Sequence, residues 1–589
     1  MWCSKLRLRQ RFNYGLAVLL ITLPLQLAFA QQLNVEIRGV DGKLKENVES
    51  LLEIKRLANN DNQDSLSAYR IRYLHRQAAK DIRQALEPFG YYHVQVNSEL
   101  KTQTTPWLAL YNITLNEPVR IGDVSWVIKG EAENDPAFQA WAATHRPQTG
   151  EVFNHQRYES AKSKLNQLAS EHGYHQAEFT EHQVRVDIAS NRANITVVFD
   201  SGPRYHFGPV SFSAAELTDA FLQRYVTFAP GDPYYAEKVL DLQMALVDSQ
   251  YFESVIIKPL WPESGSTEVP IDVDTTPNAK SHYRVGLGYG TDTGARLTFA
   301  QDRRWVNDSG HHYQAALRLS QVQSTGSFTY IIPGRSPRTD SYRLRGEVSN
   351  KRNEEQHSKK YLVGVSDIRR LGGWQRTYAL DLMQENFSIG DFEEGNSQFL
   401  VPRTHWNYIS ARDRLNVNEG YRIELGLKGG SDSVLSDTTF VSATASAKSI
   451  LPFTDRWRVI SRLALGATKV DDFSVLPPSL RFFTGGDNSV RGYGYEQLGP
   501  RNADGAVIGG RYLVAGSVEF DYRFAEQWRV AVFTDIGNVM LEPNQPLKQS
   551  IGFGFRWISP IGSIRLDFAQ AIDEPDKPWR LHFTLGPDL

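Results

Sequence analysis

The nine residues 485–493, Gly-Gly-Asp-Asn-Ser-Val-Arg-Gly-Tyr, lie within the longest connection between regularly patterned segments of the chain. This connection runs from about residue 468 to residue 511 and is too long and too rich in glycine to be a simple turn. On both sides of it apolar and polar residues alternate, as they do in β-strands with one apolar face. Residues 485–493 are therefore expected to lie in a long loop within an extensive antiparallel β-structure.

The alternation is clearest in residues 528–537, whose two faces differ in chemistry. One face carries Trp528, Val530, Val532, Thr534 and Ile536, and the other carries Arg529, Ala531, Phe533, Asp535 and Gly537. The same alternation occurs in 421–428, 562–569 and 579–586. A single strand of this kind fits a soluble sandwich as well as a membrane barrel, whose strands are apolar outside and polar inside.

The length of the alternating region separates these two fold classes. It begins near residue 280 and continues to residue 586, whereas sandwich domains usually end within roughly 100–250 residues. With ~9–11 residues in each spanning strand, the region has room for about sixteen strands of a transmembrane antiparallel β-barrel. The strands are expected near 283–290, 294–301, 311–321, 325–332, 341–349, 359–370, 373–385, 398–408, 421–429, 438–449, 456–467, 512–523, 527–537, 550–557, 562–570 and 578–586.

The sequence before this region contains a repeated unit. An amphipathic helix ends at a glycine or a polar residue, and a tyrosine and a strand follow it; the tyrosines are Tyr91, Tyr174 and Tyr251, roughly 80 residues apart. Each helix carries apolar residues at helical spacing and therefore buries one face. These residues are Leu74, Ala78, Ile82 and Leu86; Tyr158, Ala161, Leu165 and Leu168; and Val239, Leu242 and Leu246. The repeat predicts three α+β modules with the element order β-α-α-β-β.

The expected domain boundaries follow from the repeat and from the alternating region. The three modules are expected at 31–116, 117–202 and 203–278, and the barrel at 279–589 with its long loop at about 468–511. Residues 1–30 combine basic residues, an apolar stretch and Ala28-Phe29-Ala30, a pattern typical of a secretory signal. A membrane anchor is the alternative, although the apolar stretch is shorter than the ~20 residues that span a bilayer.

Composition excludes several classes of function. Cys3 is the only cysteine and lies in the signal segment, so we expect the exported protein to have neither a disulfide nor a cysteine nucleophile. The net charge of −2 shows no basic excess, so we expect no nucleic acid among the partners. The His311-His312 pair has no third ligand nearby in the pattern, and no GxSxG or HExxH motif occurs. We therefore expect neither a metal, nor a cofactor, nor an enzymatic activity.

The motif in the long loop carries a family resemblance. Gly485, Gly486, Ser489, Val490, Arg491, Gly492 and Tyr493 match the GGxxSVRGY/F signature of the BamA/TamA superfamily of outer-membrane assembly and secretion barrels. Asp535 and Gly537 are similar to the family's second motif, a strand aspartate two residues before a glycine. The resemblance implies that the loop folds into the barrel and that Arg491 contacts Asp535. We expect a wet lumen to weaken this pair, and a solvated loop arginine is the alternative for Arg491 alone.

The repeated modules resemble polypeptide-transport-associated (POTRA) domains, and three generic α+β modules are the alternative. Three POTRA modules, a barrel of about sixteen strands and a secretory signal are together most similar to the TamA branch of the superfamily. This resemblance implies a bacterial outer-membrane location, with the POTRA modules in the periplasm.

The first and last barrel strands are the expected working surface. In this family they pair poorly, and the seam between them is proposed to open sideways and template client strands. The first strand contains Gly286, Gly288 and Gly290, and the last contains Phe583, Leu585 and Gly586. Glycine weakens a strand because it has no side chain to pack; accommodation of barrel curvature is the alternative explanation for these glycines.

The resemblance implies an assembly factor that inserts autotransporter-like outer-membrane proteins. Its expected partners are an inner-membrane-anchored periplasmic protein of the TamB kind, client barrels and outer-membrane lipid. Phospholipid transfer between the two membranes and a two-partner-type secretion pore remain alternatives. A passive channel is disfavoured because it has no reason to carry periplasmic modules.

Overall fold

The computed structural model describes residues 33–59, 67–213, 216–263, 265–292, 294–353, 355–391, 393–411, 417–559 and 562–586. The predicted signal segment 1–30 lies outside the described residues. The chain divides into two compact units, Met1–Tyr205 and His206–Leu589. None of the helices among the described residues is long and apolar enough to cross a membrane.

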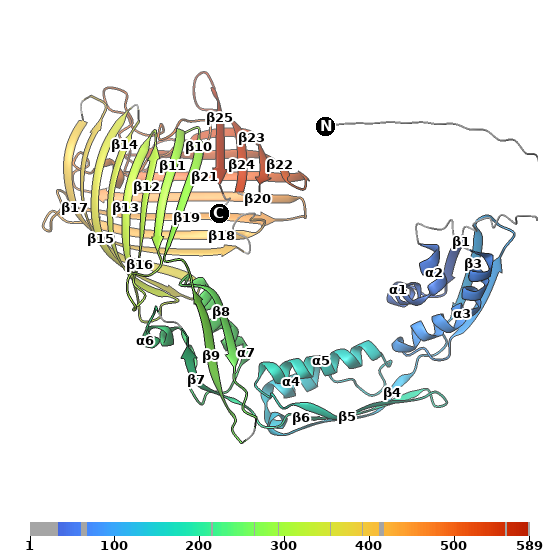
Figure 1. Ribbon diagram of the computed structural model, residues 1–589. Helices are drawn as coiled ribbons and strands as arrows, with labels where there is room; N and C mark the ends of the chain where they lie inside the picture. The colour runs from blue at the N-terminus through green and yellow to red at the C-terminus, as the bar shows by residue number, and fades with distance from the viewer. Residues whose placement is uncertain are drawn as a thin grey trace, which may run out of the picture. The chain divides into compact units, whose positions relative to one another are not determined.

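The first unit contains two α+β modules (Figure 1). In the first, the sheet order is β1-β3-β2, with β1 parallel and β2 antiparallel to the central strand. Its elements are β1 (Leu33–Arg38), α1 (Gly42–Leu51), α2 (Glu53–Ala58), α3 (Ala68–Leu86), β2 (Gln95–Lys101) and β3 (Trp107–Thr114). In the second, the order is β4-β6-β5, with the same strand directions. Its elements are β4 (Arg120–Lys129), α4 (Pro136–His145), α5 (His155–Glu171), β5 (Glu178–Asp187) and β6 (Arg192–Asp200).

A third module with the same topology opens the second unit. Its sheet order is β7-β9-β8, again with one parallel and one antiparallel pair. Its elements are β7 (His206–Phe212), α6 (Asp219–Leu222), α7 (Ala236–Asp248), β8 (Phe252–Pro259) and β9 (Glu268–Pro277). The element order of all three modules is the predicted β-α-α-β-β, with one additional short helix in the first.

The helix faces explain why these modules form. Leu74, Ala78 and Ile82 on α3 are buried, as are Tyr158 and Leu165 on α5. Leu168 and Val239, which were also predicted to be core residues, are only partly buried. Each helix packs this apolar face against its own sheet, so each module has its own core.

Glycine is required at the junction between α3 and the strand that follows it, β2. Gly90 has a φ of +89°, in the left-handed region that suits a helix C-terminus. A Cβ atom there would lie 2.5 Å from the carbonyl oxygen of Phe153. Gly173, at the equivalent junction of the second module, has a φ of +80°. The repeated glycine-tyrosine junctions of the sequence therefore mark true helix ends.

The second part of His206–Leu589 is a sixteen-stranded antiparallel sheet in which each strand pairs with the next. The sheet curves round until β10 and β25 approach each other (Figure 1). Its strands are β10 (Ser281–Gly290), β11 (Gly294–Arg303), β12 (His312–Ser320), β13 (Gln323–Pro333), β14 (Asp340–Arg352), β15 (Gln356–Leu371), β16 (Trp374–Ile389), β17 (Glu393–Ala411), β18 (Gly420–Gly430), β19 (Phe440–Pro452), β20 (Trp457–Val470), β21 (Tyr512–Ala525), β22 (Trp528–Met540), β23 (Lys548–Ser559), β24 (Gly562–Ala571) and β25 (Trp579–Gly586). The predicted barrel of about sixteen strands is confirmed.

The two faces of the barrel have opposite chemistry. On β22, Val532 and Ile536 are exposed, whereas Arg529 and Asp535 on the opposite face are buried. Large apolar side chains such as Val363 on β15 and Phe553 on β23 are likewise exposed on the outer face. An apolar outside and a polar inside are what a bilayer requires of a barrel.

The third module is held against two turns at one end of the barrel. The Tyr251 hydroxyl donates a 2.6 Å hydrogen bond to the carbonyl oxygen of Gly310, between β11 and β12. The Arg224 guanidinium donates to the carbonyl oxygens of Pro333 (3.0 Å) and Gly334, before β14. The module is therefore fixed beside the first barrel strands.

Candidate functional site: a buried arginine network and an open seam

The long loop lies between β20 and β21, from residue 471 to residue 511. Short bridges join Phe482 to Gly510 and Thr484 to Leu498, so the loop has its own fold. Val490 and Tyr493 are buried, together with Ala571 of β24. A Cβ atom at Gly537 of β22 would come within 3.0 Å of Val490, so the loop packs directly on the inner face of the barrel.

Arg491 is the centre of the polar contacts that the loop makes. Its Nε and Nη2 atoms each donate a 2.9 Å hydrogen bond to a different oxygen of the Asp535 carboxylate, and its backbone N–H donates a third to Asp535. Its Nη1 atom donates to Glu519 (2.7 Å) and to Asp567 (3.2 Å). The guanidinium also lies over the ring of Phe533, 3.3 Å from its centroid. One loop side chain thus connects β21, β22 and β24.

A second arginine shares two of these carboxylates. Arg556 of β23 donates to Glu519 (2.8 Å) and also to Asp567 (2.5 Å). Both arginines are at most 2 % exposed and the three carboxylates at most 6 %. The prediction of a wet lumen around the Arg491–Asp535 pair is wrong, because the loop and the strands exclude solvent from the network.

Glu519, Asp567 and Arg556 were not among the predicted site residues. All three are on the inner face, where the alternation of the sequence also places Asp567. What was missing was the register between neighbouring strands, which brings Ser517 opposite Asp535 and Gly554 opposite Asp567. The charged residues at inward-facing positions were the available signal. That signal does not reveal which residues of neighbouring strands lie at the same level along the barrel axis.

The seam is defined here as β10 and β25. Within the described residues no hydrogen-bonded ladder joins these two strands, although every other neighbouring pair of barrel strands is laddered. Near the C-terminal end of β10 the two strands approach each other: the rings of Tyr289 and Phe583 lie 6.3 Å apart, and the Phe583 N–H donates to the Thr291 hydroxyl (3.2 Å).

The predicted seam residues take different places on these strands. Gly286, Gly288 and Gly290 lie on β10, where they pair with β11, and Phe583, Leu585 and Gly586 lie on β25, where they pair with β24. On β10, Val285 and Leu287 are 68 % and 81 % exposed, and Arg284 and Gly286 on the opposite face are exposed too. Residues 284–287 of the first strand are therefore covered on neither face.

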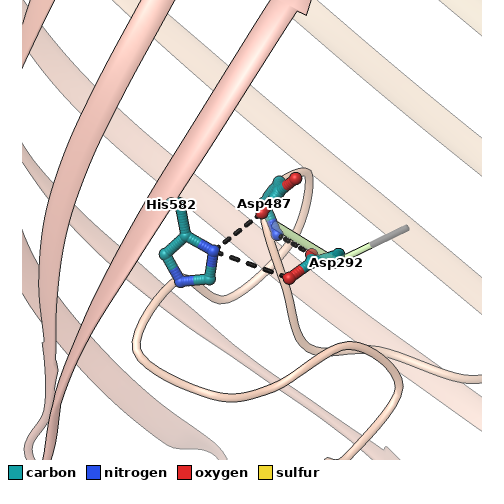
Figure 2. Close-up of side chains that lie close together, drawn as sticks. All are labelled: Asp292, Asp487 and His582. Atoms are coloured by element: carbon teal, nitrogen blue, oxygen red, sulfur yellow. Dashed lines mark hydrogen bonds and ion pairs between the residues drawn. The ribbon is translucent and has the colours of Figure 1, made fainter. Parts of the chain in front are cut away.

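A polar cluster lies where the loop meets the seam (Figure 2). It contains Asp292 from the turn after β10, Asp487 from the loop and His582 from β25. The His582 Nδ1 atom lies 2.7 Å from Asp487 and 3.7 Å from Asp292, and the Asp487 N–H donates to Asp292 (2.7 Å). Burial, together with the neighbouring Asp487, raises the pKa of Asp292 to about 6. The sequence alone does not reveal this cluster, because its members are far apart in the chain.

These three side chains are a candidate for holding a metal ion, since one donor atom of each lies within 4.8 Å of the others. The second ring nitrogen of His582 argues against that role. The Gly492 N–H points at Nε2 (3.4 Å), which makes Nε2 an acceptor and leaves the ring proton on Nδ1. Nδ1 is then a hydrogen-bond donor to Asp487 and has no lone pair for a metal.

Comparisons with known proteins agree with this architecture. A family model for the Omp85 superfamily domain matches residues 306–588, and one for the first POTRA domain of TamA matches residues 34–115. The outer membrane protein assembly factors BamA of Neorickettsia risticii and Nitratidesulfovibrio vulgaris are each 22% identical, over 66% and 72% of this chain and 55% and 56% of their own lengths. The chain thus spans about half the length of these curated relatives.

A solved structure shares the fold. BamA from Haemophilus ducreyi lacking POTRA domains 1–3 superposes with a TM-score of 0.67 at 16% identity, covering 80% of this chain and 99% of that one. With an Omp85 superfamily domain over most of the barrel and a POTRA domain near the N-terminus, the chain is an outer-membrane β-barrel protein with periplasmic POTRA domains.

Proposed function

We propose that this protein is an outer-membrane assembly factor that inserts client β-barrel proteins, especially autotransporter-like ones, by pairing a client strand with its first strand. The observation that carries the proposal is the seam, where β10 has a ladder partner on one side only within the described part of the chain. The name of the matched relatives, outer membrane protein assembly factor, supports the same class of activity.

The physical driving force is the satisfaction of backbone hydrogen bonds. Over residues 281–288, β10 pairs with β11, and about half of its backbone N–H and C=O groups therefore face the seam. Each such group costs several kcal/mol when it faces hydrocarbon without a partner. A client strand that adds to this edge satisfies them together, so the pairing needs no nucleotide hydrolysis.

Glycine keeps this edge accessible. A side chain at Gly288 would have only the flexible Arg296 side chain as a near neighbour, at 3.4 Å, and Gly286 has still more room. Neither residue is glycine because of crowding within the barrel. Their lack of side chains weakens the packing of β10, which favours exchange of its partner strand.

We also propose an inner-membrane-anchored periplasmic partner of the TamB kind, which would dock on the first module. The match of residues 34–115 to the first POTRA domain of TamA supports this branch of the superfamily. The sheet of this module has β2 at one edge, and β2 is largely exposed. An exposed edge of this type accepts an added strand from a partner.

A reversible lock across the seam tests the proposal. Cysteines replacing Tyr289 and Phe583, whose rings lie 6.3 Å apart, are to be bridged by a disulfide or a short bis-maleimide. Because the only natural cysteine is Cys3, no other thiol of the exported chain competes. We expect the locked protein to stop assembling a client autotransporter, and reductant to restore assembly of the disulfide form. Undiminished assembly by the locked protein would refute strand exchange at the seam and would favour an indirect role such as phospholipid supply.

A further inference from the structure

The contacts at the seam do more than join two strands, because they also fix the loop that carries Arg491. Four residues take part. Three of them are Asp292 from the turn after β10, Asp487 from the loop and His582 from β25 (Figure 2). The fourth is Thr291, from the same turn as Asp292. We call these four residues the latch. The Thr291 hydroxyl donates to Asp487 (3.3 Å) and accepts from the Phe583 N–H (3.2 Å). The latch is thus a continuous set of hydrogen bonds through three separate segments.

His582 is the residue on which this set depends. Through Nδ1 it donates to Asp487, and through Nε2 it accepts from the Gly492 N–H. These two loop residues lie on either side of Arg491. His582 is only 3 % exposed, so solvent has little access to its side chain. One side chain of the last strand therefore holds both flanks of the loop segment that enters the arginine network.

Strand pairing extends this connection to the network itself. His582 lies directly opposite Asp567 in the β24–β25 ladder, and Asp567 accepts hydrogen bonds from both Arg491 and Arg556. If β25 leaves the seam, the loop loses its bonds to His582, and the partner strand of Asp567 is displaced. The position of β25 and the conformation of the loop are therefore not independent.

The latch is also built so that it can open. The carboxylates of Asp292 and Asp487 lie close together, and no lysine or arginine of the described residues pairs with either of them. A polar cavity of about 310 Å³ borders Thr291 and Asp292. Gln356, which also lines this cavity, is 4 % exposed, and neither polar atom of its side chain has a partner among the residues that the structure describes. Water in the cavity can take over the hydrogen bonds of the latch when they break.

We infer that His582 is a positioning residue that couples the seam to the loop, so that opening of β25 and release of residues 487–492 are a single event. The inference deepens the proposed function, on which its role in client entry rests. In that role a client strand that displaces β25 would free the loop at the same time. The coupling itself is a property of the protein without a client and is testable in that state.

Hydrogen exchange of the full-length protein in lipid nanodiscs tests the coupling. In His582→Ala, we expect amides in both 579–585 and 487–492 to exchange about ten-fold faster, the factor that corresponds to loss of one hydrogen bond to a charged group. His582→Asn retains an N–H near the position of Nδ1 and should recover part of the protection. Leu581→Ala, on the same strand but facing outward, is the matched control and should leave the loop unchanged.

Three results would overturn the coupling. They are unchanged exchange in both segments, faster exchange in 579–585 alone, and an effect of a chelator on the wild type that equals the effect of His582→Ala. The last result would mean that the cluster holds a metal ion. Asp487→Asn distinguishes a metal site from the hydrogen-bonded coupling, because the amide oxygen of the new side chain still accepts the hydrogen bond from His582. The seam lock could fail to stop client assembly while the coupled hydrogen exchange is still observed. That result would reject the proposed function but not the coupling through the latch.

Discussion

At the scale of the residue, Arg491 shows how a loop can be fixed inside a barrel with a few contacts. Its guanidinium binds the Asp535 carboxylate with two parallel hydrogen bonds, a geometry that lysine cannot reproduce. Because the surrounding carboxylates are buried, removing this one cation would take the nearest positive charge from Asp535 and leave Arg556 to pair with both Glu519 and Asp567. Loss of one partner of a buried ion pair typically costs about 3–5 kcal/mol.

Arg491→Ala is accordingly expected to displace the loop and to impair client assembly, while the barrel still reaches the outer membrane. Arg491→Lys keeps the charge but not the paired hydrogen bonds, so its effect should be intermediate. The measurement is the fraction of an autotransporter client assembled in cells that depend on this protein, normalised to the amount of barrel in the membrane. Normal assembly by Arg491→Ala would contradict the role assigned to the network.

His75 in the first module predicts a dependence of stability on pH. Burial on α3 lowers the pKa of His75 below its ordinary value of 6.5, and its Nδ1 lies 2.9 Å from the Tyr111 hydroxyl. The folded module therefore binds fewer protons than the unfolded chain, so its stability is greatest above pH 6.5 and falls as the pH drops below that value. We expect the urea midpoint of the fragment 31–205 to fall between pH 7.5 and pH 5.5, and to fall less in His75→Gln. An equal fall in both proteins would assign the effect to other groups.

Which of these residues a sequence can reveal depends on whether they lie in a local motif. Arg491 and Asp535 each lie in a short recognisable pattern, and alternation gives the face on which Asp535 lies. Glu519 and His582 lie in strands that carry no short motif of this kind. Their roles depend on strand register and on the path of the loop, which are set by contacts between segments far apart in the chain.

At the scale of the element, the contact between the loop and β22 depends on a missing side chain. A Cβ atom at Gly537 would lie 2.6 Å from the carbonyl oxygen of Val514 and 3.0 Å from Val490. We expect Gly537→Ala to loosen the loop and to speed hydrogen exchange in residues 487–493. Gly346→Ala, in β14, is the matched control, because a Cβ there has no neighbour within 4 Å. Equal exchange in the two variants would show that the loop does not need this close approach.

The strands themselves were largely predictable, because the alternation of apolar and polar residues marks each one. Their ends were not. The segment predicted at 398–408 is β17, which runs from Glu393 to Ala411, and β16 extends to Ile389. Backbone pairing continues beyond the stretch in which the side chains alternate, so the pattern marks the middle of a strand better than its ends.

The hydrogen bonds between the third module and the barrel give a prediction at the same scale. Arg224→Ala removes the hydrogen bonds to the carbonyl oxygens of Pro333, Gly334 and Arg335. Tyr251→Phe removes the contacts of the Tyr251 hydroxyl with Gly310 and His312. We expect faster hydrogen exchange in the turn 334–339 for Arg224→Ala and in the turn 304–311 for Tyr251→Phe. The same protection in both variants as in the wild type would mean that other contacts hold the module.

At the scale of the whole molecule, partner docking in the periplasm and strand exchange at the seam are expected to belong to different parts of the protein. Deleting residues 31–115 removes the first module and leaves the other two modules and the barrel. We expect the deletion to abolish co-purification of a TamB-like partner while the barrel remains in the outer membrane at its normal level. Unchanged co-purification would reject the assignment of partner docking to the first module.

The most direct test of the central claim, that β10 templates client strands, is a map of disulfides between the two proteins in intact cells. One cysteine replaces Gly288, and others are placed singly along the terminal strand of a stalled autotransporter barrel. A cysteine at Val363, on the outer face of β15 and far from the seam in the sheet, is the control. We expect crosslinks from position 288 that alternate with a period of two along the client strand, and none from position 363. Crosslinks without a register, or their absence while client assembly still depends on this protein, would contradict templating by β10.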